Sequence, residues 1–327
     1  MADRIVTGDL NQNDREQEVQ LRPQNFSEFI GQQKVVDNID LMVKSSIMRK
    51  TAMDHVLLSG PPGLGKTSLA MLISKALGSE LHLVSGPAIE KKGDIAAVLT
   101  NLKPKDVLFI DEIHRMHITV EEILYSAMED FRLDILIGQG ASARTMQIDL
   151  TPFTLIGATT RSGLLSNPLR DRFMAHLNFD FYEPDMLGKI LMNNARKMNM
   201  DMSEEAKMQN AKRSRGTPRI ANRILRRVRD FALVNKSKQV ELKEVQAALS
   251  LLDIDDLGLD SMDRKILNVM KNYYQGGPVG IEALSATLGE DKQTIEEVYE
   301  PYLLKEGLIL RTPRGRTLSE KATKHLT

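Results

Sequence analysis

The segment Gly60-Pro-Pro-Gly-Leu-Gly-Lys-Thr67 decides the fold, because it fits the pattern G-x-x-x-x-G-K-[ST] of a phosphate-binding loop. It follows an apolar run at 55–59, which predicts a buried strand, and it opens a helical pattern. Its glycines allow the backbone to curl until N–H groups face phosphate oxygens, and the helix N-terminus adds positive potential. Strand, loop and helix together predict a nucleotide-binding α/β domain.

The side chains of this loop suit a magnesium nucleoside triphosphate. Lys66 is long enough to reach the β- and γ-phosphates, Thr67 can place its hydroxyl on Mg²⁺, and Ser68 comes next, for the α-phosphate. The backbone of Gly63, Leu64 and Gly65 would contact the phosphates. We therefore expect ATP and Mg²⁺ as the ligands.

Short apolar runs alternate with helical stretches on both sides of the loop. Further strands are predicted at 81–85, 107–110, 153–158 and 176–181. This alternation predicts a parallel sheet with helices on both faces. Residues 132–150 break the rhythm with two stretches of alternating polarity around Gly-Gln-Gly-Ala-Ser at 138–142, which predicts an inserted β-hairpin.

Two carboxylates end the strand at 107–110. Asp111 suits a position near Mg²⁺, and Glu112 suits a general base that polarises the attacking water. The strand at 153–158 runs into Thr159, whose hydroxyl could hold that water between Glu112 and the γ-phosphate. The sequence therefore predicts a hydrolytic site rather than a passive nucleotide pocket.

Arginines that suit the γ-phosphate lie outside the loop. Arg172, with Arg170 as the second choice, lies just before the last core strand, where a cation could act in trans on the nucleotide of a neighbouring subunit. Arg219 follows Pro218 in the first turn of a later helix, from which it could sense the γ-phosphate. Both are predicted to assist hydrolysis.

The chain divides into three predicted domains behind a short lead-in. Residues 1–20 are polar and predict a flexible segment, 21–182 form the large ATPase domain, and 183–253 form a small helical domain with helices near 185–198, 203–214, 218–235 and 241–251. Residues 254–327 predict a winged helix with helices near 261–274, 281–288 and 291–300, followed by a basic wing.

The wing carries the candidate DNA contacts. Arg311, Arg314 and Arg316 surround a tight turn that could reach phosphates without reading sequence. The helix at 291–300 is acidic through Asp291, Glu296, Glu297 and Glu300, so we do not expect it to enter the major groove.

The composition excludes several classes of protein. Cysteine is absent, so no disulfide framework exists, and the six histidines show no spacing that suggests zinc. No signal peptide or membrane-spanning run is present, so a cytoplasmic protein is expected. The 44 basic and 44 acidic residues balance in number, but basic residues are concentrated at 212–229 and in the wing, so we expect any nucleic-acid contact to be local.

The motifs occur in an order that resembles the RuvB branch-migration ATPases of the AAA+ superfamily. The resemblance rests on Gly60–Thr67, on Asp-Glu-Ile-His at 111–114, and on Gly-Ala-Thr-Thr-Arg at 157–161. It also includes Pro-Leu-Arg-Asp-Arg-Phe at 168–173, Arg-Gly-Thr-Pro-Arg at 215–219, Leu-Arg-Pro at 21–23 with Ile-Gly-Gln at 30–32, and Arg-Thr-Pro-Arg-Gly-Arg at 311–316. It runs from about residue 18 to 318.

The resemblance implies further site residues. Leu21, Arg22 and Tyr182 would hold the adenine side of ATP, and Glu129, Asp130 and Phe131 would lie near the nucleotide. On the hairpin, Met146 and Ile148 would form an apolar dock for a junction-binding protein of the RuvA type.

The resemblance also implies a function. The protein would be an ATP-driven motor, a hexameric ring that pumps duplex DNA to branch-migrate Holliday junctions during homologous recombination and DNA repair, working with a RuvA-type partner and a RuvC-type resolvase. A protein-remodelling or clamp-loading AAA+ ATPase is the main alternative, although its aromatic pore loop is not evident. A transcription regulator with ATP as a switch is the second, and the acidic helix at 291–300 argues against it.

Overall fold

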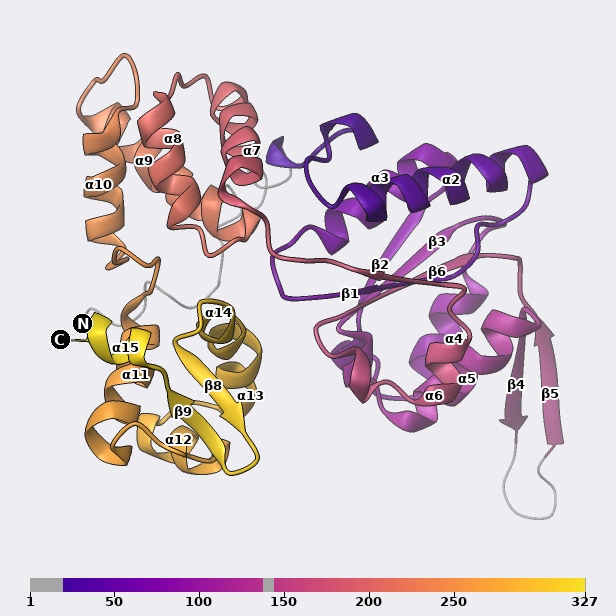
Figure 1. Cartoon of the computed structure of the whole chain (residues 1–327). Coiled ribbons are helices and arrows are strands. Elements are labelled where there is room, and N and C mark those ends of the chain that lie inside the picture. Colours follow the sequence, from indigo (N-terminus) through magenta and orange to yellow (C-terminus); the bar gives the residue numbers. More distant parts are fainter. Residues whose placement is uncertain (1–19, 138–143, 327) are drawn as a thin grey trace.

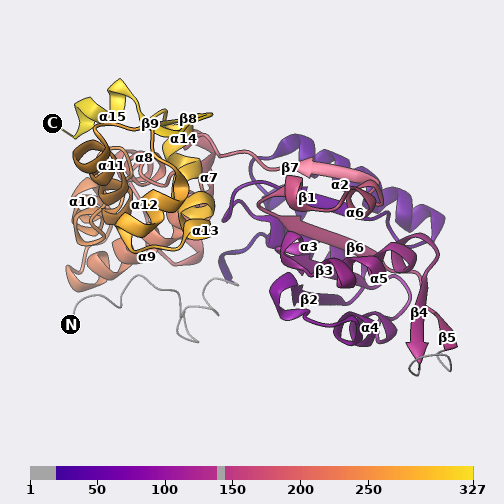
Figure 2. The same ribbon diagram turned by 90° about the horizontal axis from the view of Figure 1, so that it is seen from below.

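The computed structural model describes residues 20–137 and 144–326. The predicted turn at 138–142 and nearly all of the predicted lead-in at 1–20 lie outside these ranges. Three units follow one another along the chain (Figures 1 and 2): a sheet domain, four helices, and a small domain that contains a two-stranded hairpin.

The first unit is built on a parallel five-stranded sheet, as predicted. Its strands are β1 (Val56–Ser59), β2 (Leu81–Ser85), β3 (Val107–Asp111), β6 (Thr154–Thr159) and β7 (Ala175–Asn178), in the spatial order β2-β3-β6-β1-β7. The central strands β1, β3 and β6 are almost wholly buried, which explains their continuous apolar character.

Helices cover both faces of this sheet (Figure 1). One face is covered by α2 (Gln33–Arg49) and α3 (Lys66–Leu77), and the other by α4 (Lys92–Thr100), α5 (Ile118–Glu129) and α6 (Asn167–Asp171). Alternate residues of each strand enter the two cores: Val56 and Leu58 of β1 face α2 and α3, whereas Leu57 packs on the other side.

The predicted hairpin is formed by β4 (Arg132–Ile137) and β5 (Arg144–Asp149), which pair antiparallel. It projects from the edge of the domain, away from the other two units (Figure 1).

The second unit contains α7 (Pro184–Lys197), α8 (Glu204–Lys212), α9 (Pro218–Val234) and α10 (Leu242–Leu251), and we call it the lid. Its apolar residues form one continuous core with those on the α2–α3 face of the sheet. The lid is therefore packed against the ATPase domain and does not form an independent core.

The third unit has its own core and the expected winged-helix order. Its elements are α11 (Ser261–Tyr274), α12 (Ile281–Leu288), α13 (Lys292–Thr294), a π-helical turn at Ile295–Tyr299, α14 (Glu300–Lys305), the wing strands β8 (Ile309–Thr312) and β9 (Gly315–Leu318), and α15 (Glu320–His325). The predicted helix at 291–300 thus continues to Lys305, and α15 was not predicted.

An ion pair buried between the lid and the winged-helix domain joins these two units. The guanidinium of Arg215 donates two hydrogen bonds to the carboxylate of Asp263, at 2.8 and 3.2 Å, and lies over the ring of Tyr302. Burial raises the pKa of Asp263 to about 7 although Arg215 acts to lower it. Because both charged groups are buried, removing either one would leave the other without its partner in a site with little access to water, which is strongly destabilising.

Candidate nucleotide site

The phosphate-binding loop is held in a conformation that only glycine adopts easily. Gly60, Gly63 and Gly65 have φ values of 134°, 80° and 107°. A side chain at Gly60 would also meet the carbonyl oxygen of Phe179 at 2.4 Å, and one at Gly63 would meet the Cβ of Arg219 at 2.9 Å. No side chain caps α3, so its first N–H groups are available to a phosphate.

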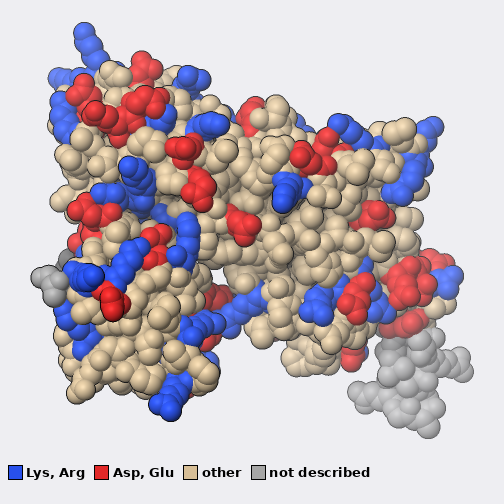
Figure 3. Space-filling model, viewed as in Figure 1, with Lys and Arg blue, Asp and Glu red and all other residues tan. Residues whose placement is uncertain are grey.

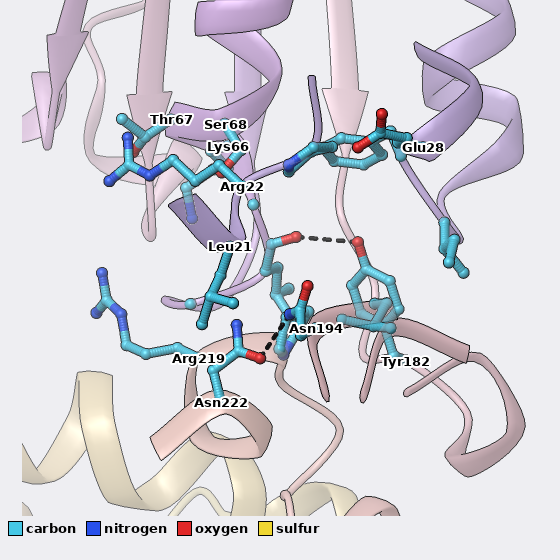
Figure 4. A pocket seen from close by; sticks show the side chains of 18 of the residues that line it. Leu21, Arg22, Glu28, Lys66, Thr67, Ser68, Tyr182, Asn194, Arg219 and Asn222 are labelled. Carbon is cyan, nitrogen blue, oxygen red and sulfur yellow. Dashed lines mark hydrogen bonds between the residues drawn. The ribbon is translucent and has the colours of Figure 1, made fainter. Parts of the chain in front are cut away.

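A cavity of about 260 Å³ opens over this loop, between the ATPase domain and the lid (Figure 4). Most of the residues predicted to bind ATP or Mg²⁺, and the predicted base Glu112, line it; they are Leu21, Arg22, Gly63, Leu64, Gly65, Lys66, Thr67, Ser68, Asp111, Glu112, Tyr182 and Arg219. Sequence reasoning did not identify the lid residues Asn194 and Asn222, which line the cavity and are hydrogen-bonded to each other at 2.7 Å. The site is therefore completed by the lid.

Lys66 is folded into the loop. Its ammonium group donates to the carbonyl oxygens of Gly60 and Pro61, at 2.6 and 2.9 Å. Burial lowers the pKa of Lys66 to about 8, against the opposing effect of the carboxylates of Glu112 and Asp111. A bound phosphate would supply the anion that this buried cation lacks.

Asp111 ends β3 and Glu112 follows it, and both line the cavity, as their position in the sequence predicted. Burial, and then the charge of Asp111, raises the pKa of Glu112 above the ordinary value for a glutamate. The two carboxylates and the Thr67 hydroxyl are hard oxygen donors, which suit Mg²⁺. A carboxylate with a raised pKa beside a metal site suits proton abstraction from water.

The two threonines at the end of β6 have different partners. Thr159 is fully buried, and its hydroxyl lies 2.9 Å from Nδ1 of His114 rather than at the cavity. Thr160 donates a hydrogen bond of 3.2 Å to Glu112. Sequence reasoning selected Thr159 for the water and did not select Thr160, which is the one of the two that contacts Glu112.

Arg172 does not line the cavity of its own chain. Its guanidinium lies over the ring of Tyr125 and bonds to the carboxylate of Glu129 at 2.9 Å. Glu129, Asp130 and Phe131 are also absent from the lining, and Phe131 packs against Phe153 in the core. Any contact of this group with a nucleotide would have to be made to a neighbouring subunit.

On the hairpin, Met146 is 45% exposed, whereas Ile148 is partly buried against the core of its own domain. The two candidate docking residues therefore differ in what they offer to a partner.

The wing arginines are engaged with the acidic helix of the same domain. Arg311 and Arg316 pair across the hairpin, and both donate to the carboxylate of Glu300. Arg316 also bonds to Glu296, and only 12% of its side chain is exposed. Arg314 is exposed at the turn.

This network changes the interpretation of the helix at 291–300. Three of its four acids point at cations, since Glu297 reaches Arg161 of the ATPase domain. These three acids are therefore paired with arginines and are not a free acidic face, while the expectation that the helix stays out of the major groove remains a prediction. In the space-filling view, basic and acidic side chains are interspersed over the three units (Figure 3).

Fold and site together define an ATPase of the P-loop class with the helical lid of AAA+ proteins. Family models agree: "Holliday junction DNA helicase RuvB P-loop domain" matches residues 21–179, "RuvB AAA lid domain" matches 182–255, and "RuvB C-terminal winged helix domain" matches 256–327.

Similar proteins share the whole architecture. A "Holliday junction branch migration complex subunit RuvB" from Clostridium kluyveri is 53% identical over 99% of this chain and 93% of its own length, and one from Paramagnetospirillum magneticum is 51% identical over 100% and 93%. The solved Thermotoga maritima RuvB branch migration motor is 51% identical, with a TM-score of 0.87, covering 94% of this chain and 98% of the other. The chain belongs to the RuvB family. None of the helices in its described ranges is long and apolar enough to cross a membrane.

Proposed function

We propose that this protein is an ATP-hydrolysing motor that moves duplex DNA through Holliday junctions during recombination and repair. The observation that carries the proposal is the closure of the nucleotide site by the lid. The backbone N–H of Arg219 donates to the carbonyl oxygen of Gly63 at 3.3 Å, so α9 rests directly on the phosphate-binding loop. The same lid is joined to the winged-helix domain through Arg215 and Asp263. Events at the phosphates therefore have a physical route to a DNA-binding wing.

At the triphosphate, Lys66 and the free N–H groups of α3 neutralise the β- and γ-phosphates, and Arg219 approaches from the lid. Thr67 and Asp111 would hold Mg²⁺, which screens the charge of the phosphate oxygens. Glu112 orients and deprotonates the attacking water, and Thr160 fixes its carboxylate.

At the other end of the cavity, Leu21 and Tyr182 enclose the adenine. Tyr182 is anchored by its hydroxyl, which donates to the carbonyl oxygen of Leu64 at 3.1 Å (Figure 4). Arg22 lies beside Met71, and its charge faces the same opening. These contacts position the nucleotide without taking part in the chemistry.

Arg172 acts in trans within a homohexameric ring. It is held by Glu129 and Tyr125 outside its own cavity, so it is presented to the nucleotide of the next subunit. Hydrolysis in one subunit would then weaken the contact with its neighbour and change the angle between domains.

The wings contact the DNA backbone through Arg311, Arg314 and Arg316, with little dependence on sequence. Met146 and Ile148 dock a RuvA-type junction-binding protein, and a RuvC-type resolvase acts on the same junction. We place this activity in the cytoplasm.

The decisive experiment is branch migration of a synthetic four-way junction, with and without a RuvA-type protein. We expect ATP-dependent conversion to duplex products that Lys66→Ala abolishes while the protein stays folded. ATP hydrolysis that rises with unfolded protein but not with duplex or junction DNA would contradict the proposal and favour a protein-remodelling ATPase.

The trans role of Arg172 has its own test. Rings of Arg172→Ala alone, or of Glu112→Gln alone, should be inactive. Mixed rings should regain part of the activity, because some interfaces then combine an intact Glu112 with an intact Arg172. Mixed rings as inactive as either parent would contradict action in trans.

A further inference from the structure

The winged-helix domain contacts the ATPase domain through a carboxylate that is shared by an arginine of each domain. Helices α13 and α14, which flank the π-helical turn Ile295–Tyr299, lie on the side of the winged-helix domain that faces the sheet (Figures 1 and 2). One oxygen of Glu296 accepts a hydrogen bond of 2.8 Å from Arg161 of the ATPase domain. The other accepts one of 2.9 Å from Arg316 of the wing. Glu296 therefore bridges the wing and the ATPase domain.

The ATPase end of this bridge lies at the edge of the hydrolytic site. Arg161 directly follows Thr160, which donates to Glu112. The backbone N–H of Arg161 donates to the hydroxyl of Thr159 at 2.9 Å. Any shift of this segment therefore changes the distance between Arg161 and the carboxylate of Glu296.

The wing end of the bridge encloses a candidate DNA contact. Only 12% of the Arg316 side chain is exposed, compared with 54% for Arg311. Besides its bond to Glu296, Arg316 donates two hydrogen bonds to Glu300, at 2.9 and 3.1 Å. A DNA phosphate is an anionic oxygen acceptor like these carboxylates, so it has to compete with them for the guanidinium.

Arg316 can leave without depriving either acid of its last cation. Glu300, whose side chain is 2% exposed, keeps the two hydrogen bonds from Arg311, at 2.7 and 2.8 Å. Glu296 keeps its bond to Arg161. Removing the last partner of a buried charge is strongly destabilising, and the exchange of Arg316 between Glu296 and a phosphate avoids that cost.

We propose that Glu296 is an internal competitor of DNA, which holds Arg316 in the free protein and gives it up to a backbone phosphate, and that Arg161 sets the strength of this competition. Arg161 attracts the same carboxylate. Its charge therefore weakens the hold of Glu296 on Arg316 and reduces the repulsion between Glu296 and an incoming phosphate. The proposal rests on the assignment of Arg316 to DNA in the proposed function, and it adds a regulating residue in the ATPase domain.

Binding of a labelled DNA duplex to the full-length protein, measured by fluorescence anisotropy, tests the competition. Glu296→Gln keeps the shape of the side chain but removes its charge, so the duplex should bind about fivefold more tightly, the factor for one partly exposed ion pair. In the Arg316→Gln background, Glu296→Gln should change the affinity by less than about twofold, because the contested cation is absent.

Glu282→Gln is the matched control. It removes the same charge from a glutamate of the same domain that is exposed and pairs with Lys292 instead of a wing arginine. Its affinity for the duplex should stay within about twofold of the wild type, because a single exposed charge away from the wing is screened by salt.

Arg161→Gln tests the second half of the proposal. It leaves Glu296 to Arg316 alone, so duplex affinity should fall about threefold although Arg161 lies outside the wing. In the Glu296→Gln background, Arg161→Gln should change the affinity by less than about twofold, because the charge through which Arg161 acts is gone. A direct contact between Arg161 and DNA would instead lower the affinity equally in both backgrounds.

Unchanged or weaker binding by Glu296→Gln would overturn the competition, and so would an equal gain in the Arg316→Gln background. Equal losses from Arg161→Gln in both backgrounds would overturn the role of Arg161. The DNA contact of the proposed function fails through different results: a wild-type protein that does not bind the duplex, or Arg316→Gln that binds it as tightly as the wild type.

Discussion

The buried position of Lys66 predicts that nucleotide binding takes up protons. In the free protein the pKa of Lys66 is lowered to about 8, chiefly by burial. A bound triphosphate places negative charge beside the ammonium group and returns its pKa toward the ordinary value. The bound state therefore holds more protons than the free state, and affinity must fall as the pH rises through about 8.

The size of the effect follows from the fraction of protonated lysine. With a pKa of about 8, the free protein is protonated in about 0.8 of molecules at pH 7.5, about 0.5 at pH 8 and about 0.1 at pH 9. Binding should take up the remainder, about 0.5 proton per site at pH 8, and affinity should drop about eightfold from pH 7.5 to pH 9. The phosphates of ATP contribute little, because their last pKa is near 6.

Titration calorimetry measures this uptake. A slowly hydrolysed ATP analogue is titrated at each pH in two buffers with different ionisation enthalpies, and the difference gives the protons bound. Lys66→Arg is the control, because a guanidinium stays charged from pH 7.5 to 9. Its uptake should vanish and its affinity should be independent of pH. Wild-type affinity that is equal at pH 7.5 and 9, with no uptake, would refute the reasoning.

Three other predictions concern the remaining parts of the chain. Arg215→Met should lower the free energy of unfolding by about 3–5 kcal/mol, because it leaves the buried carboxylate of Asp263 without its partner. Arg213→Met should lower it by less than about 1 kcal/mol, because its partner Asp256 is 95% exposed. Chemical denaturation of both variants tests this, and equal losses would contradict the argument. Met146→Asp should weaken binding to a RuvA-type protein and leave the melting temperature unchanged, because Met146 is exposed. Ile148→Asp should lower both the affinity and the melting temperature, because Ile148 packs against the core of its own domain. Binding measurements and thermal scans test this, and unchanged binding in Met146→Asp would rule out Met146 as a docking residue. Arg314→Ala should weaken DNA binding equally for all sequences and reduce the slope of log affinity against log salt by about one; an unchanged slope would show that Arg314 does not contact a phosphate.

The sequence was most informative about those parts of the fold and the site that are made of residues adjacent along the chain. The phosphate-binding loop, the acidic pair at 111–112 and the inserted hairpin are each continuous segments, so their patterns could be recognised directly. The strand order β2-β3-β6-β1-β7 could not be derived in this way, because it depends on which distant strands pair.

The ends of helices in the winged-helix domain were harder to predict. The sequence pattern placed the end of one helix near residue 300. The structure continues it to Lys305, because a π-helical turn ends at Tyr299 and Pro301 falls in the first turn of α14, where its missing N–H is tolerated. Helix α15 has only six residues, mostly polar, so it carries no apolar period that a pattern could reveal.

The parts of the site that were missed all depend on residues far apart in the chain. His114 shows no zinc spacing in the sequence, yet folding places it beside Glu112 and Glu297, and these three side chains are close enough to be a possible metal cluster. Likewise, Glu296 and Glu300 looked like an exposed acidic face until their partners Arg161, Arg311 and Arg316 were located. Pairings of this kind are a property of the tertiary structure.

The salt bridge between Arg215 and Asp263 has a mechanical consequence. It fixes the lid to the winged-helix domain, so we expect a displacement of the lid to be passed on to that domain. Because the backbone of Arg219 contacts the phosphate-binding loop, a change at the loop that displaces α9 would be carried through this salt bridge to the domain that holds Arg314.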